Sequence, residues 1–154
     1  MALEDEVGAL RRNPLFAKVS PSKLKLLAFT SERIDYEKGQ DLFHMGDASD
    51  SAFAIISGSA DVLIDTPNGE IKVAEVKKNA FVGEIGIICD VPRTATIRAC
   101  EHLETLKITK EQFFQLMAEF PDAAIEVMRV LGDRLTDTTA ELSLARKKIQ
   151  DIES

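Results

Sequence analysis

Between residues 31 and 108 the chain alternates short apolar runs with glycine-containing turns, and this pattern most restricts the fold that it can adopt. The runs fall at residues 32–36, 42–43, 52–56, 60–65, 71–76, 94–100 and 103–108. Many short strands at close spacing are typical of an antiparallel barrel or jelly roll. The pair Asn68-Gly69, between two of the runs, is a hairpin signal. The sequence therefore predicts a mainly β fold with flanking helices, built on an antiparallel jelly-roll-like β-barrel.

Helical patterns lie on both sides of the barrel and divide the chain into three predicted parts. Residues 1–30 form an N-terminal helical segment, in which Ser20 precedes Pro21 and is a candidate helix cap. Residues 31–108 form the barrel. Residues 109–154 form a C-terminal helix pair, because Thr109 and Gln112 have the spacing of a capping box and Phe120-Pro121 ends the first helix.

The last predicted helix carries apolar residues at alternating spacings of three and four, with Thr138 and Ala145 filling the remaining places. The apolar positions are Met128, Leu131, Leu135, Leu142, Ile149 and Ile152. Such a heptad register is typical of a helix that pairs with another helix. We expect the half through Leu135 to pack on its own domain and the half from Thr138 onward to form a homodimer seam. The alternative is that the whole stripe packs on the barrel.

The stretch at residues 81–99 carries the strongest indication of function. Gly83 and Gly86 bracket a lone carboxylate, Glu84, and Arg93 follows. Glycine allows the backbone to approach a ligand closely, and a guanidinium offers paired donors to phosphate oxygens. A carboxylate beside a phosphate is best explained as an acceptor for a sugar hydroxyl, so the stretch predicts a pocket for a ribose that carries one phosphate. The alternative is a strand-to-turn junction with a structural ion pair between Glu84 and Arg93.

At this stretch the chain resembles the cyclic nucleotide-binding domain family, the module of catabolite activator proteins, protein kinase A regulatory subunits and cyclic-nucleotide-gated channels. The phosphate-binding cassette of that family is matched by Val82, Gly83, Glu84, Gly86, Ile87, Arg93, Thr94 and Ala95. A second family block, an apolar pair followed by Gly-Asp and then an apolar strand ending in glycine, is matched at residues 42–47 and 53–58. The resemblance covers roughly residues 14–135 and includes bacterial members.

The resemblance implies a regulatory module that binds cAMP or cGMP and signals by moving its C-terminal helix. The ligand-binding residues that it implies are Gly83, Glu84, Ile85, Gly86, Ile87, Arg93, Thr94 and Ala95. Arg93 and the amides of residues 83–87 would hold the phosphate, Glu84 would accept the ribose 2′-hydroxyl, and Val73 and Val76 would line the base. The implied partners are the nucleotide, a second copy of the chain and an unidentified protein effector. The alternative function is an interaction or dimerisation module whose nucleotide pocket is degenerate.

Composition argues against several other classes of protein. The formal net charge of −7 disfavours nucleic acid and anionic membranes as partners. The acidic N-terminus is unlike a signal peptide, so we expect a cytoplasmic protein with Cys89 and Cys100 unpaired. The two histidines, His44 and His102, belong to different segments, so we expect no metal site and no cofactor. Without a metal cluster or a positioned acid/base pair we also expect no enzymatic activity.

Overall fold

The computed structural model describes the backbone of residues 3–153 and the side chains of residues 3–134 and 142–150. The strands are β1 (Glu32–Tyr36), β2 (Asp41–Phe43), β3 (Ser51–Ser57), β4 (Ser59–Thr66), β5 (Gly69–Lys77), β6 (Phe81–Val82), β7 (Thr96–Ala99) and β8 (Leu103–Thr109). The helices are α1 (Leu3–Arg11), the short 3-10 helix η1 (Pro14–Phe16), α2 (Pro21–Thr30), α3 (Glu84–Cys89), α4 (Lys110–Glu119) and α5 (Pro121–Glu153).

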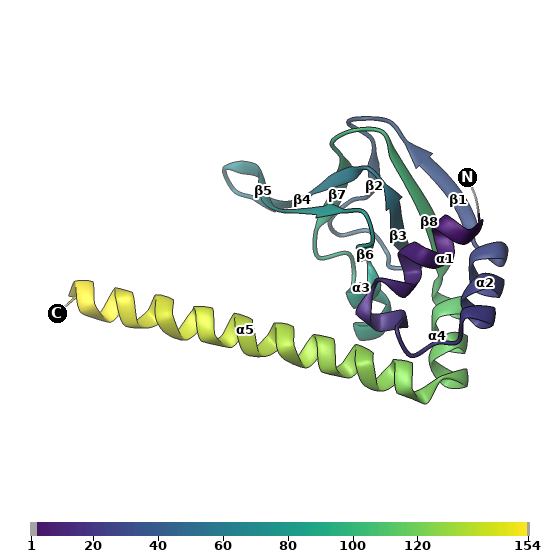
Figure 1. Ribbon diagram of the computed structural model, residues 1–154. Coiled ribbons are helices and arrows are strands. Elements are labelled where there is room, and N and C mark those ends of the chain that lie inside the picture. The colour runs from purple at the N-terminus through teal and green to yellow at the C-terminus, as the bar shows by residue number, and fades with distance from the viewer. Residues whose placement is uncertain (1–2, 154) are drawn as a thin grey trace.

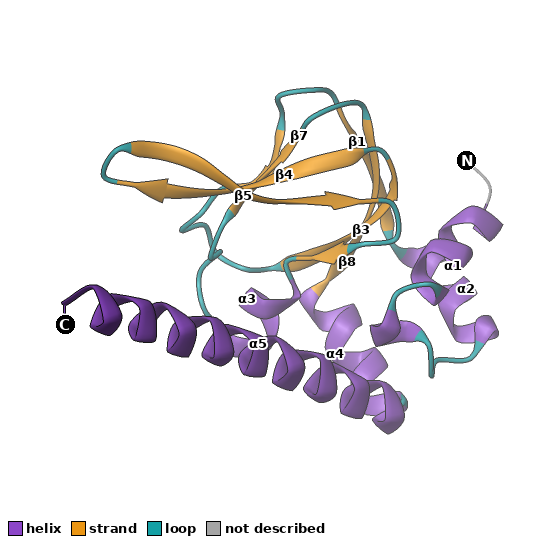
Figure 2. Cartoon of the chain, turned by 60° about the vertical axis from the view of Figure 1, so that its left-hand side comes forward, coloured by secondary structure: helices purple, strands orange, loops and turns teal. Residues whose placement is uncertain are grey.

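The strands form two four-stranded antiparallel sheets, ordered β1-β8-β3-β6 and β2-β7-β4-β5. The predicted jelly-roll-like fold is therefore confirmed, with one difference. The strands are hydrogen-bonded within two separate sheets and do not close into a barrel. Helices α1 and α2 lie at one end of the β structure, and α3, α4 and α5 lie along one side of it (Figure 2).

Strand β3 separates two hydrophobic cores. Phe53 and Ile55 face the core between the two sheets, which also contains Ile97 of β7. Ala54 and Ile56 face the opposite way, into a core shared with the helices. Because side chains alternate along a strand, a strand covered on both faces needs a continuous apolar run, as residues 52–56 provide.

The two predicted helix caps are confirmed. The Ser20 hydroxyl accepts a hydrogen bond from the Lys23 amide at 3.4 Å. At the start of α4, Thr109 and Gln112 form the reciprocal capping box, with distances of 3.1 Å to the Thr109 hydroxyl and 2.9 Å to the Gln112 side chain. These contacts satisfy amide groups that a helix leaves unpaired at its N-terminus.

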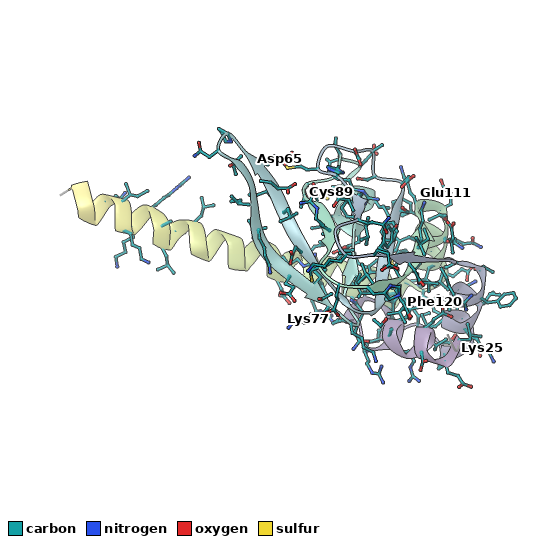
Figure 3. All side chains as sticks on the ribbon, turned by 90° about the horizontal axis from the view of Figure 1, so that it is seen from above. Lys25, Asp65, Lys77, Cys89, Glu111 and Phe120 are labelled. Atoms are coloured by element: carbon teal, nitrogen blue, oxygen red, sulfur yellow. The ribbon has the colours of Figure 1, made fainter. Side chains whose placement is uncertain are left out.

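Helix α5 and the β4–β5 hairpin both project away from the rest of the molecule. Figure 1 shows the yellow end of α5 extending past the sheets below the hairpin, and Figure 3 shows Asp65 toward the outer end of the hairpin and Lys77 at its base. With 33 residues, α5 is about 50 Å long. None of the described helices has both the length and the apolar composition needed to cross a membrane.

Among the described side chains of α5, those that pack on the domain belong to its first turns. Ala123 and Val127 are buried, and Leu131 contacts the helix-side core. Met128, predicted to pack there too, is 64% exposed, so the packed face is rotated from the heptad stripe. Leu142 and Ile149 are exposed farther along. The side chains of Leu135, Thr138 and Ile152, which belong to the same predicted stripe, lie outside the described residues.

Candidate functional site

The site is built around the junction between β6 and α3. Gly83 connects them with a φ of +91°, a left-handed conformation that side chains with a Cβ disfavour. A Cβ at this position would also lie 2.7 Å from Nη1 of Arg93. The junction therefore needs glycine for its backbone angle and for the close approach of the arginine. No side chain caps the first turn of α3.

Arg93 is held at this junction by backbone carbonyls. Its Nη1 donates to the Gly83 carbonyl at 3.0 Å and its Nη2 donates to the Ser51 carbonyl at 2.7 Å. The guanidinium lies over the ring of Phe43, 4.0 Å from the ring centroid, an arrangement that fixes the plane of the fork. The residue is only 4% exposed.

The charge of Arg93 is incompletely compensated by the protein. Its Nη2 lies 3.7 Å from a carboxylate oxygen of Asp50, which is itself largely exposed. Burial lowers the pKa of the Arg93 guanidinium, and the charges of Asp50 and Asp47 oppose this change. An arginine stays protonated even so. Its Nε–H is buried and has no hydrogen-bond partner, which is costly unless a ligand or water supplies an acceptor.

A cavity of about 370 Å³ adjoins Arg93. Its walls come from the β2-β7-β4-β5 sheet, the β6–α3 junction and α5. The lining residues are Phe43, Val62, Ala74, Val76, Phe81, Val82, Gly83, Glu84, Ile85, Gly86, Arg93, Thr94, Ala95, Ile97 and Arg134. The cavity is thus apolar along the sheet and charged at Glu84, Arg93 and Arg134, which suits a ligand with a flat apolar part and an anionic part. Among these described residues there is no histidine, cysteine or serine.

Glu84 joins the cavity to the C-terminal helix. The side chain begins α3 and is 4% exposed. Its Oε1 accepts a hydrogen bond from Nη1 of Arg134, on α5, at 2.7 Å. Removing the cationic partner of a buried carboxylate strongly destabilises the folded protein, because the buried charge is left uncompensated. The position of α5 and the environment of Glu84 therefore depend on each other.

The structure brings most of the predicted ligand-binding residues together. Seven of them line the cavity: Gly83, Glu84, Ile85, Gly86, Arg93, Thr94 and Ala95. Ile87 lies behind the wall, buried in the helix-side core. The suggested Glu84–Arg93 ion pair is not seen, because Glu84 pairs with Arg134 and Arg93 bonds carbonyl oxygens.

The predicted base pocket needs one correction. Val76 lines the cavity, but Val73 is 51% exposed and does not. Ala74 takes its place. Residues 73 and 76 differ by an odd number, so they lie on opposite faces of a regular strand, whereas 74 and 76 share a face. The alternation of the strand could have revealed this.

Sequence reasoning missed Arg134 and Phe43. Arg134 reaches the cavity from 50 residues farther along the chain, and nothing in its neighbourhood on the helix distinguishes it from other exposed arginines. Phe43 lies within the family block at residues 42–47, and only the fold reveals that its ring contacts Arg93.

The chain is similar in sequence to known proteins. Residues 33–120 match the family described as the cyclic nucleotide-binding domain. Among curated proteins, the chain is similar to lysophospholipase nte1 of Aspergillus niger, with 30% identity over 128 residues. That match covers 82% of this chain and 8% of the relative, so the chain corresponds to a small part of that protein.

Two solved structures have a similar fold. One is the sensor domain of the transcriptional regulator DNR from Pseudomonas aeruginosa, with a TM-score of 0.80, 21% identity and coverage of 90% of this chain and 94% of that one. The other is the catabolite activator protein of Thermus thermophilus, with a TM-score of 0.78, 26% identity and coverage of 86% of this chain and 62% of that one.

Proposed function

Because the chain belongs to the cyclic nucleotide-binding domain family, we propose that it is a sensor module that binds cAMP or cGMP in the cavity beside α3. The observation that carries the proposal is Arg93. A buried guanidinium on the wall of a ligand-sized cavity, whose charge is only partly balanced by the exposed Asp50 at 3.7 Å, favours an anionic ligand.

The cyclic phosphate binds at Arg93 in this proposal. The carbonyls of Gly83 and Ser51 orient the guanidinium and leave its remaining donors for phosphate oxygens. The amides of residues 83–87 lie at the same junction and supply further donors. The exposed Thr94 hydroxyl, which also lines the cavity, is placed to contact the phosphate or the edge of the base.

The sugar and the base occupy the rest of the cavity. Glu84 accepts the ribose 2′-hydroxyl, because an ionised carboxylate is an acceptor only. Val62, Ala74 and Val76 form the apolar wall against which the purine packs. This wall offers no hydrogen-bonding side chain that would distinguish adenine from guanine, so both nucleotides are tested.

The signal passes to α5 through Arg134. A ribose hydroxyl that approaches Glu84 changes the surroundings of the carboxylate that holds Arg134. If α5 can adopt two arrangements, the nucleotide shifts the equilibrium between them. The size of the shift, as a free energy, equals the difference in nucleotide binding free energy between the two arrangements. The first half of α5 moves relative to the cavity. The projecting C-terminal end of the same helix transmits this change of position to a partner.

Calorimetric titration of the purified chain with cAMP and cGMP tests the proposal. Arg93→Lys keeps the positive charge but loses the planar fork, so we expect nucleotide affinity to fall by at least about tenfold. Arg129→Lys is the control, because Arg129 is exposed, pairs with Glu126 of the same helix and does not line the cavity. Because Arg93 also stabilises the junction, thermal melts of each variant check that it is folded. Chromatography of the recovered nucleotide distinguishes binding from hydrolysis. A wild-type chain that binds neither nucleotide contradicts the proposal, as does Arg93→Lys with unchanged affinity.

A second candidate function is dimerisation without a working pocket. It is favoured by the exposed apolar residues Leu142 and Ile149, which lie at heptad spacing on the projecting part of α5. Molecular mass by light scattering, measured with and without nucleotide, separates the two: a stable dimer that binds no nucleotide supports this alternative.

A further inference from the structure

A second cluster of potential ligand atoms lies on β1 and β8, away from the cavity. Carboxylate oxygens of Asp35 and Glu104 and a ring nitrogen of His102 all lie within 4.8 Å of one another. Asp35 lies on β1, the edge strand of its sheet, Glu104 lies on β8, and His102 immediately precedes β8. The residues that line the nucleotide cavity include none from these two strands.

The register of the sheet forces the two carboxylates together. Asp35 and Glu104 are direct partners in the antiparallel β1–β8 ladder, so their side chains share a face of the sheet. Like charges directly opposite each other are destabilising. Arg33 shares that face of β1, but it forms an ion pair with the buried carboxylate of Glu6. A cation bound between Asp35 and Glu104 would relieve the repulsion.

His102 is oriented so that one ring nitrogen faces this pair of carboxylates. Its Nδ1 lies 3.2 Å from Oε1 of Glu37, and its Nε2 lies 3.8 Å from Oδ2 of Asp35. An ionised carboxylate only accepts hydrogen bonds, so the Nδ1 carries the proton. In the neutral ring the Nε2 then presents its lone pair toward Asp35. A carboxylate that orients a histidine in this way is the usual outer partner of a metal-binding histidine.

The distances suit ligands on either side of one ion. An Nε2···Oδ2 separation of 3.8 Å is too long for a hydrogen bond. Two ligands that each lie about 2.0–2.2 Å from a zinc ion can be separated by up to about 4.4 Å. All three donor atoms already lie within 4.8 Å of one another, close to that range, and the side chains of Asp35 and His102 are exposed.

The segment that carries His102 is held in place by the turn between β3 and β4. A Cβ at Gly58 would lie 2.3 Å from the His102 carbonyl oxygen, so the two backbones are in close contact. The Cys100 amide donates to the Ser59 carbonyl at 3.1 Å. Fixed backbone positions on both sides reduce the cost of ordering ligands around an ion.

We propose that Asp35, His102 and Glu104 form a binding site for a divalent transition metal of the zinc class, with water completing the coordination. One imidazole nitrogen and two carboxylate oxygens match the preference of Zn²⁺ for mixed nitrogen and oxygen ligands, whereas Mg²⁺ and Ca²⁺ prefer oxygen ligands alone. Glu37 is a positioning residue that holds the ring. The sequence argument against a metal counted histidines alone and did not foresee that the strand register brings two carboxylates to one of them.

Titration of the full, untagged chain with ZnCl₂ by calorimetry, and with CoCl₂ by visible absorption, tests the site. We expect one Zn²⁺ per chain, loss of detectable binding in His102→Asn, and affinity about tenfold weaker in Glu37→Gln, with a changed Co²⁺ spectrum. His44→Asn is the matched control, because His44 is exposed and pairs with Asp41 at 3.0 Å on the other sheet. Cys89→Ser tests the exposed thiol.

Each outcome decides the proposal. Binding that persists in His44→Asn and Cys89→Ser but is lost in His102→Asn supports it. No Zn²⁺ binding by the wild-type chain, or binding that survives in His102→Asn, overturns it. Melting temperatures without metal, measured for every variant, show that a loss of binding is not a loss of fold.

Discussion

At Gly83 the chain passes from β6 into α3 with a left-handed backbone angle, directly beside the guanidinium of Arg93. A side chain at this position would therefore cause both backbone strain and a steric clash with Arg93. A residue with a Cβ pays about 1–2 kcal/mol for that angle. The added carbon also displaces Nη1 from its place against the Gly83 carbonyl. The residue affects the stability of the junction and the position of the proposed phosphate ligand at once.

We expect Gly83→Ala to lower the free energy of unfolding by at least about 1–2 kcal/mol and to weaken nucleotide binding. Urea denaturation and calorimetry measure the two effects. Gly132→Ala on α5 is the control, because its new Cβ meets no atom within 4 Å and alanine favours a helix by up to about 1 kcal/mol. A Gly83→Ala variant as stable as the wild type would show that the junction relaxes without cost.

At the scale of elements, the contact between Glu84 of α3 and Arg134 of α5 is a long-range connection that ties the terminal helix to the cavity. A double-mutant cycle with Glu84→Gln and Arg134→Gln measures it. We expect each single change to be destabilising and the two to be coupled by about 0.5–3 kcal/mol in urea denaturation, because Glu84 is buried.

The control cycle uses Glu126 and Arg129, an ion pair within α5 whose arginine is exposed. Exposed pairs on a helix couple by about 0.3–0.5 kcal/mol, and because the Glu126 side chain is 16% exposed we expect at least this coupling here. If the Glu84 and Arg134 changes are additive, α5 is not linked to the cavity through them and the proposed route of the signal is wrong.

Local sequence patterns predicted helix caps and a hairpin well, but they did not predict contacts between residues far apart in the chain. The caps at Ser20 and Thr109 involve residues three apart, so their patterns are visible in the sequence. The Asn68-Gly69 signal located the β4–β5 hairpin, although Thr66 pairs with Gly69 and the turn residues are Pro67 and Asn68. The cassette was recognisable because most of its residues lie within one short stretch.

What the sequence could not predict depends on elements that meet only in the folded chain. The Arg134 contact with Glu84 spans 50 residues, and the Arg93 contact with the Ser51 carbonyl spans 42. The division of the strands into two sheets depends on pairings such as β1 with β8, which no local pattern reveals. The exposure of Met128 depends on which face of α5 packs on the domain, and that face is rotated from the heptad stripe.

At the scale of the whole molecule, α5 extends well beyond the domain that it starts from (Figure 1). A helix with exposed apolar residues at heptad spacing is suited to pair with a second copy. We expect Leu142→Asp combined with Ile149→Asp to convert a dimer into a monomer in light scattering, because charges at the seam would be buried without partners.

Leu144→Asp is the matched control. Leu144 is about as exposed as Leu142 but lies outside the heptad positions. If Leu144→Asp disrupts the dimer and the double substitution does not, the seam lies on another face of the helix. A chain that is monomeric at all concentrations contradicts the homodimer altogether.

The double coverage of β3 has a consequence for how such a module could respond to its ligand. Ser51, whose carbonyl anchors Arg93, is the first residue of this strand, and the strand is clamped between hydrophobic layers on either side. The phosphate of the ligand would thus contact Arg93, which is anchored to a strand that is packed on both faces. The sugar end would meet the carboxylate of Glu84, which pairs with Arg134 on a long helix packed on the domain at one end. If the proposed ligand binds, α5 is therefore the element that we expect to move, because it is held to the site through the Glu84–Arg134 contact.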